Sequence, residues 1–81
     1  MSVRATIEEQ MRSVARDQEK TLAPLHDSLP LLESGLDSLC FAILTARLED
    51  ELGVDPFADM DLAEFPVTFG NLVDFYDKAL G

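Results

Sequence analysis

The chain has 81 residues with 16 acids and 6 Lys or Arg, so its formal net charge at pH 7 is −10. A hydrophobic fraction of 47% is too high for a disordered acidic segment and predicts one small folded domain, residues 1–81. This charge argues against nucleic acid and anionic membranes as partners, and the length argues against a deep enzyme cleft.

The N-terminus has no apolar signal core, and no apolar run is long enough to cross a bilayer. Cys40 is the only cysteine, so an internal disulfide is excluded and a reducing compartment is expected. We therefore expect a soluble, cytoplasmic protein that is a monomer. The negative charge is uneven, because residues 1–20 are neutral and the whole excess lies in residues 21–81.

The first predicted helix covers residues 6–20. Thr6 and Glu9 have the spacing of a capping box, and one apolar stripe follows at helical spacing. That stripe consists of Ile7, Met11, Val14 and Ala15. Residues 21–37 form a long connection broken by prolines and Gly35, but six leucines predict that it packs over the helices.

The second predicted helix covers residues 38–52. Asp37 or Ser38 is expected to cap its start, and Gly53 to end it in a left-handed conformation. The expected core stripe is Phe41, Leu44, Leu48 and Leu52. Cys40, Ile43 and Arg47 then share another face, which is expected to be exposed, although Ile43 could equally be partly buried.

The last part of the chain predicts a short helix at residues 59–64 and a longer one that Thr68 caps and that ends near Leu80. Three acids lie in this short helix and one precedes it, but the four lack the spacing and the central glycine of a calcium loop. These acids are Asp55, Asp59, Asp61 and Glu64. The chain is therefore predicted to be an all-α bundle with three main helices and one short helix.

A catalytic site is not expected. A nucleophilic serine needs a base and an oxyanion-binding loop, yet His26 is the only histidine and no glycine-rich loop accompanies Ser38. Cys40 near the start of a helix could be considered as a nucleophile, but a lone cysteine is usually a packing residue. The plainest interpretation of Asp37 and Ser38 is a helix cap.

The combination of features supports a more specific interpretation. Residues 31–39 read LLESGLDSL, a helix with a leucine stripe and an acidic end follows, and Gly53 closes it. Together with the order of the other elements, this pattern resembles the acyl and peptidyl carrier protein family. The resemblance extends over residues 6–80 and implies a small four-helix carrier-protein bundle that is not itself an enzyme.

In that family a phosphopantetheinyl transferase attaches 4′-phosphopantetheine, donated by coenzyme A, to the serine of this motif. The resemblance therefore implies that Ser38 carries the arm, with Asp37 and Leu39 beside it and Leu36 as a further apolar contact. An ATP-dependent aminoacyl or acyl ligase would load the terminal thiol with a thioester. A downstream acceptor enzyme would then receive the cargo.

The cargo is left open between two kinds. Fatty acid carriers usually place acids on the first turns of the second helix, where this chain has Cys40, Ile43 and Arg47. These residues are therefore candidates for partner contact, and a free-standing aminoacyl carrier is favoured over a fatty acid or polyketide acyl carrier. An alternative of another class is a small acidic helical adaptor that binds a basic partner, with no prosthetic group and with Ser38 only as a cap.

Overall fold

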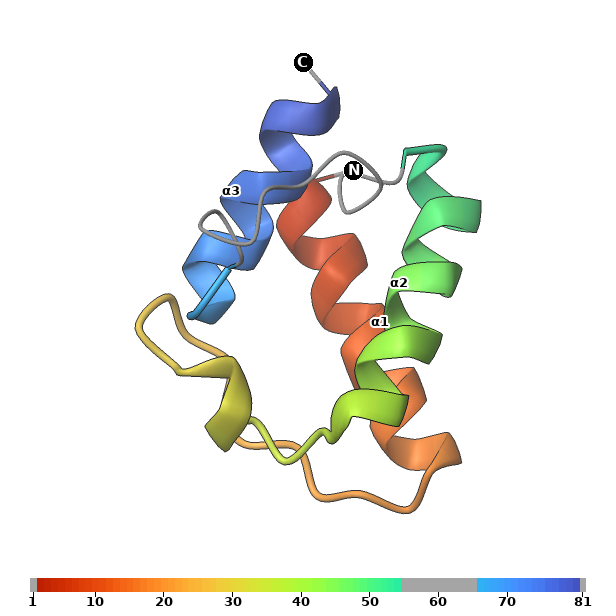
Figure 1. Cartoon of the computed structure of the whole chain (residues 1–81), viewed down its shortest axis with the longest axis vertical. Coiled ribbons are helices and arrows are strands. Elements are labelled where there is room, and N and C mark those ends of the chain that lie inside the picture. Colours follow the sequence, from red (N-terminus) through yellow and green to blue (C-terminus); the bar gives the residue numbers. More distant parts are fainter. Residues whose placement is uncertain (1, 55–65, 81) are drawn as a thin grey trace.

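The computed structural model describes residues 2–54 and 66–80, and it confirms the expected all-α fold in this part of the chain (Figure 1). Its elements are α1 (Val3–Asp17), a 3-10 turn η1 (Leu31–Glu33), α2 (Ser38–Leu52) and α3 (Phe69–Leu80). The predicted short helix at residues 59–64 lies outside the described residues. The same holds for its four acids, Asp55, Asp59, Asp61 and Glu64.

Helix α1 begins earlier than predicted, at Val3 instead of Thr6. The side chain of Ser2 caps it by accepting a hydrogen bond from the amide of Ala5 at 3.0 Å. Thr6 lies one turn inside the helix, where it is buried and donates its hydroxyl to the Ser2 carbonyl at 3.2 Å. The expected capping box of Thr6 and Glu9 is therefore wrong, because Ser2 offers an equally good cap one turn earlier.

Helix α1 also ends earlier, at Asp17 instead of Lys20. Glu19 adopts a left-handed backbone with φ 57, and the amide of Lys20 turns back to the carbonyl of Ala15 at 2.7 Å. Such a reversal satisfies the last carbonyls of the helix and directs the chain away from its axis. It carries Lys20 toward the start of α2, where its ammonium meets Asp37.

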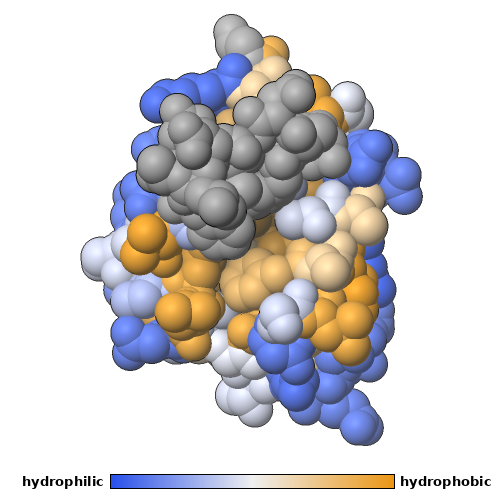
Figure 2. Space-filling view, viewed as in Figure 1, coloured by the Kyte–Doolittle hydropathy of each residue, from blue (hydrophilic) through white to orange (hydrophobic). Residues whose placement is uncertain are grey.

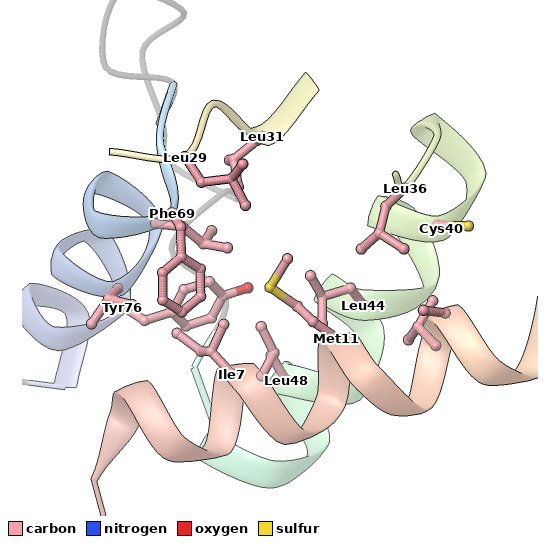
Figure 3. Close-up of a cluster of buried hydrophobic side chains, with 14 residues drawn as sticks. Ile7, Met11, Leu29, Leu31, Leu36, Cys40, Leu44, Leu48, Phe69 and Tyr76 are labelled. Atoms are coloured by element: carbon pink, nitrogen blue, oxygen red, sulfur yellow. The ribbon is translucent and has the colours of Figure 1, made fainter. Parts of the chain in front are cut away.

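One apolar core joins the three helices, and Figure 3 shows Ile7 and Met11 of α1 facing Phe69 and Tyr76 of α3 with Leu48 of α2 beside them. The stripe expected on the first helix is confirmed, since all four of its members are buried. Helix α2 is rotated relative to the prediction. Its fully buried residues are Cys40, Leu44 and Leu48, while Phe41 and Leu52 are only partly buried.

The connection between α1 and α2 is fastened to the start of α3. The amide of Leu31 donates to the Val67 carbonyl at 2.8 Å, and the amide of Phe69 donates to the Leu29 carbonyl at 2.9 Å. Leu29, Leu31 and Leu36 are buried, which confirms that most of the apolar connection packs on the helices. Leu32 is an exception, because 94% of it is exposed.

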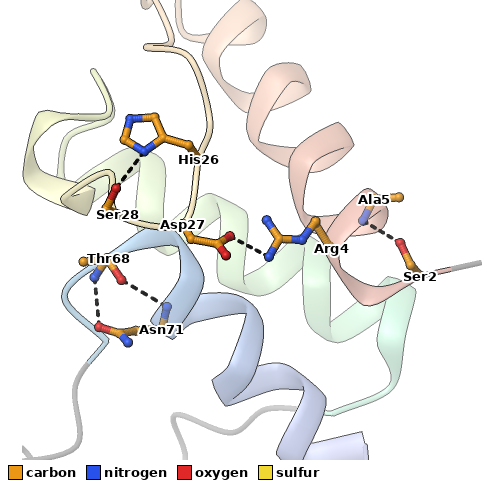
Figure 4. Close-up of polar contacts among 8 residues, drawn as sticks. All are labelled: Ser2, Arg4, Ala5, His26, Asp27, Ser28, Thr68 and Asn71. Atoms are coloured by element: carbon orange, nitrogen blue, oxygen red, sulfur yellow. Dashed lines mark hydrogen bonds and ion pairs between the residues drawn. The ribbon is translucent and has the colours of Figure 1, made fainter.

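Two polar contacts complete this junction (Figure 4). The guanidinium of Arg4 pairs with Asp27 at 2.6 Å, which ties α1 to the connection. Thr68 accepts a hydrogen bond from the amide of Asn71 at 3.1 Å, and the Asn71 side chain accepts one from the amide of Thr68 at 3.3 Å. The predicted cap of the last helix is therefore confirmed, in a reciprocal form.

Candidate functional site

The start of α2 is capped by Asp37, not by Ser38. Asp37 has an extended backbone, and its Oδ1 accepts a hydrogen bond from the amide of Cys40 at 2.9 Å. Ser38 is the first residue of the helix and is exposed. Because the carboxylate satisfies the free amide, the helix end does not require the hydroxyl of Ser38, and the interpretation of Ser38 as the cap is wrong.

A tightly held turn precedes this serine. Ser34 is fully buried, and its hydroxyl donates to the Leu31 carbonyl at 2.6 Å while the Ser34 carbonyl accepts the amide of Ala23 at 2.9 Å. Gly35 has φ 96, and a Cβ added there would lie 2.0 Å from the carbonyl oxygen of Thr21. Only glycine fits this close crossing of two chain segments, so the turn delivers Ser38 to the surface in a defined place.

Ser38 lies at the edge of an apolar groove of about 590 Å³. Figure 2 shows apolar side chains gathered on one face of the molecule, with hydrophilic residues along much of its rim. The groove is lined by the η1 turn, by the first two turns of α2 with the residues just before them, by the residues just before α3, and by Leu72 of α3 itself. The lining residues on α2 and next to it include Leu36, Asp37, Ser38, Phe41, Ala42 and Thr45, and those from the other segments include Leu31, Leu32, Pro66 and Val67.

Asp37 remains ionised far into acid solution. The hydrogen bond from the Cys40 amide is the main cause, and the ammonium of Lys20, 3.4 Å from Oδ2, adds to it. Together they lower the pKa of Asp37 from 3.8 to about 2. A carboxylate therefore stands beside Ser38 at every physiological pH.

This shift predicts a pH dependence of stability. Because the folded pKa of Asp37 lies below its ordinary value, its stabilising contribution is complete above about pH 4 and is lost as the pH falls toward 2. The Asp37→Asn variant lacks this contribution at every pH. The difference in free energy of unfolding between the wild type and the variant should therefore become smaller as the pH falls from about 4 toward 2. Urea unfolding between pH 2 and 5 measures this difference. Asp74→Asn, on the exposed face of α3, controls for removing one carboxylate, and a difference that stays constant would contradict the prediction.

The face proposed for partner contact is only partly exposed. Cys40 is buried and Leu36 is 5% exposed, so the expectation that these two present surface to a partner is wrong. Arg47 faces α1, where it donates to Ser13 at 2.9 Å and pairs with Asp17 at 2.7 Å. The physical reason is the orientation of α2, which buries the side with Cys40, Leu44 and Leu48 in the core.

Ile43 and Leu39 are the remaining apolar residues of α2 that were expected near the arm or at the partner contact. Ile43 is partly buried and packs against the core, which settles the alternative left open for it. Leu39 follows Ser38 directly and is 61% exposed. The apolar residues that do surround Ser38 at the surface thus include Leu32 and Val67, which residue spacing did not indicate because they come from separate segments.

Other chemistries find no support in the described part of the chain. His26 hydrogen-bonds through Nδ1 to the hydroxyl of Ser28 at 3.1 Å (Figure 4). Residues 2–54 and 66–80 contain no group of three or more His, Cys, Asp or Glu that could hold a metal ion. Among the same residues, no helix is both long and apolar enough to cross a membrane.

Comparison with known proteins agrees with this geometry. Residues 4–75 match the family described as phosphopantetheine attachment site. Neither the curated proteins nor the solved structures contain a match to the chain. Members of the matched family carry 4′-phosphopantetheine covalently on a serine and are carriers, not enzymes. An exposed serine whose helix is capped by its neighbour fits such an attachment. The chain therefore belongs to the phosphopantetheine-binding carrier family.

Proposed function

We propose that Ser38 carries the phosphopantetheine arm and that the chain delivers an aminoacyl group between enzymes. One observation carries the assignment of Ser38: it is exposed at the first residue of α2, while Asp37 alone caps the helix. When attached, the arm supplies a thiol that holds the cargo as a thioester. The lone Cys40 supports the cytoplasm, a reducing compartment, as its location.

The helix itself favours a phosphate at this position. The first amides of α2 have no partner within the helix, and the N-terminal end of a helix carries partial positive charge. Asp37 occupies the Cys40 amide, and the remaining amides of the first turn stay available to an anion on Ser38. The backbone amides of the first turn would thus bind the phosphate, while the cap provided by Asp37 leaves the hydroxyl of Ser38 accessible.

The charges of α2 support an aminoacyl cargo over a fatty acyl one. Its first turn contains no acid, and its acids Glu49, Asp50 and Glu51 lie exposed at the opposite end. An enzyme that docks through a basic patch therefore finds no acid on the helix near Ser38 other than the capping Asp37. A phosphopantetheinyl transferase, an ATP-dependent aminoacyl ligase and a downstream acceptor enzyme are the proposed partners.

The cargo is tested on the carrier itself. Carrier recovered from the cytoplasmic fraction of producing cells is analysed by intact mass before and after hydroxylamine, which cleaves thioesters. We expect a released mass that corresponds to one amino acid, with an amine that an amine-reactive reagent labels. A series of masses that differ by CH₂ units, with no amine, would instead identify an acyl carrier.

Leu39 is the proposed contact for the ligase, because it is the exposed apolar residue next to Ser38. Leu39→Glu should slow loading of the modified carrier about tenfold, a loss of about 1.4 kcal/mol, since a charge replaces an apolar contact at the interface. Stability should change little. Ala46→Glu adds the same charge two turns along α2 at an exposed position and is the control. Equal loading rates for the two variants would exclude Leu39 from the contact.

A further inference from the structure

Lys20 and Asp37 form an ion pair at the root of the proposed arm. The ammonium of Lys20 lies 3.4 Å from Oδ2 of Asp37, while Oδ1 is held by the amide of Cys40. The Lys20 side chain is 40% exposed, so it can readjust to a new neighbour. Its position is fixed by the backbone, because the turn at Glu19 returns the Lys20 amide to Ala15. The pair thus links the end of α1 to the start of α2.

Attachment of the arm changes the charge balance of this pair. A phosphodiester on Ser38 adds one negative charge next to the carboxylate of Asp37, which is ionised at physiological pH. Two anions would then share one helix N-terminus, and like charges at such distances destabilise each other. Among the other bases of the described chain, Arg4 pairs with Asp27, Arg12 with Glu8 and Arg47 with Asp17. Lys20 is the cation paired with Asp37, and Ser38 follows Asp37 directly in the chain.

We propose that Lys20 is the shared counter-ion of Asp37 and of the phosphodiester on Ser38, and thereby a positioning residue for the root of the arm. This inference rests on the proposed role of Ser38. In the unmodified protein the ammonium of Lys20 forms its ion pair with Asp37. In the modified protein the same ammonium neutralises the additional charge, so Lys20 contributes more to the stability of the modified form than to that of the unmodified form.

The test compares urea unfolding of both forms for the wild type, Lys20→Gln and Arg16→Gln. Arg16 is an exposed base in the last turn of α1, so its variant controls for the loss of one positive charge. Lys20→Gln should reduce the folding equilibrium constant about threefold more in the modified form than in the unmodified form, as for a partly exposed ion pair. This excess loss should disappear in 1 M salt, and it should be absent in Lys20→Arg, which keeps the positive charge. Arg16→Gln should affect both forms equally.

A second readout reports on the phosphate directly. The ³¹P resonance of the modified protein should move in Lys20→Gln and stay in place in Arg16→Gln. If the intact mass shows the arm but Lys20→Gln affects both forms equally and leaves the ³¹P resonance unmoved, the counter-ion role is overturned while the carrier function stands. If wild type gains no arm in the presence of coenzyme A and a transferase, the proposed role of Ser38 fails, and this inference fails with it.

Discussion

Ser38→Ala should abolish attachment of the arm and leave the fold intact. Incubation with coenzyme A and a promiscuous phosphopantetheinyl transferase should add the mass of one phosphopantetheine to the wild type and nothing to the variant. The free energy of unfolding should change by less than about 0.5 kcal/mol, because Ser38 is exposed and the cap belongs to Asp37. Intact mass spectrometry and urea unfolding of the same samples measure both quantities.

Ser34→Ala is the matched control, four residues earlier. Its hydroxyl is fully buried and donates to the Leu31 carbonyl at 2.6 Å, so its loss leaves a buried acceptor without its donor. The expected destabilisation is about 1–3 kcal/mol, with attachment retained wherever the variant is folded. A mass gain in Ser38→Ala would place the arm on another residue. A stability loss in Ser38→Ala as large as that in Ser34→Ala would contradict the separation of capping and attachment.

The methyl group that Gly35→Ala adds should destabilise the fold more than one added at any other glycine in the described part of the chain. Its φ of 96 strains any side chain, and the added Cβ would lie 2.0 Å from the Thr21 carbonyl oxygen. Backbone strain and forced displacement of the crossing segment together should destabilise the fold by about 3 kcal/mol or more. Urea unfolding monitored by circular dichroism measures the loss.

Gly53→Ala separates the two causes. Gly53 also has a positive φ, 74, but nothing lies within 4 Å of the position of its Cβ. Its substitution should therefore show the backbone strain alone, about 1 kcal/mol. Similar losses in the two variants would mean that the crossing at Thr21 yields to the methyl group, and that the turn before Ser38 is less tightly held than its geometry indicates.

Features with local causes were predictable from the sequence. Gly53 ends α2 and Thr68 caps α3 as expected, because each residue satisfies the backbone of its own helix end. The predicted start of α1 at Thr6 is wrong, because Ser2 and Thr6 are both residues that commonly cap helices and the capping preference alone does not distinguish them. The packing of the folded domain selects the earlier start at Val3, because Thr6 then lies on the buried side of the helix.

Features that depend on several segments were not predictable in the same way. Stripes through Cys40 or through Phe41 both have helical spacing, and the packing of the whole domain leaves Cys40 buried and Phe41 only partly buried. The groove beside Ser38 combines Leu32 and Val67 with α2, and residue spacing carries no information on such a meeting. Ser38 could be proposed as the attachment residue because its motif is contiguous, whereas its surroundings are assembled by the fold.

The hydrogen bonds between the connection and the start of α3 have a consequence for how the proposed attachment site is assembled. The bonded pairs Leu31 with Val67 and Phe69 with Leu29 lie roughly forty residues apart in sequence, so their loop-closure entropy must be overcome late in folding. A nascent chain that has exposed Ser38 but not yet α3 lacks these partners. The groove beside Ser38 is therefore completed only when the residues at the start of α3 have been synthesised and have paired with the connection.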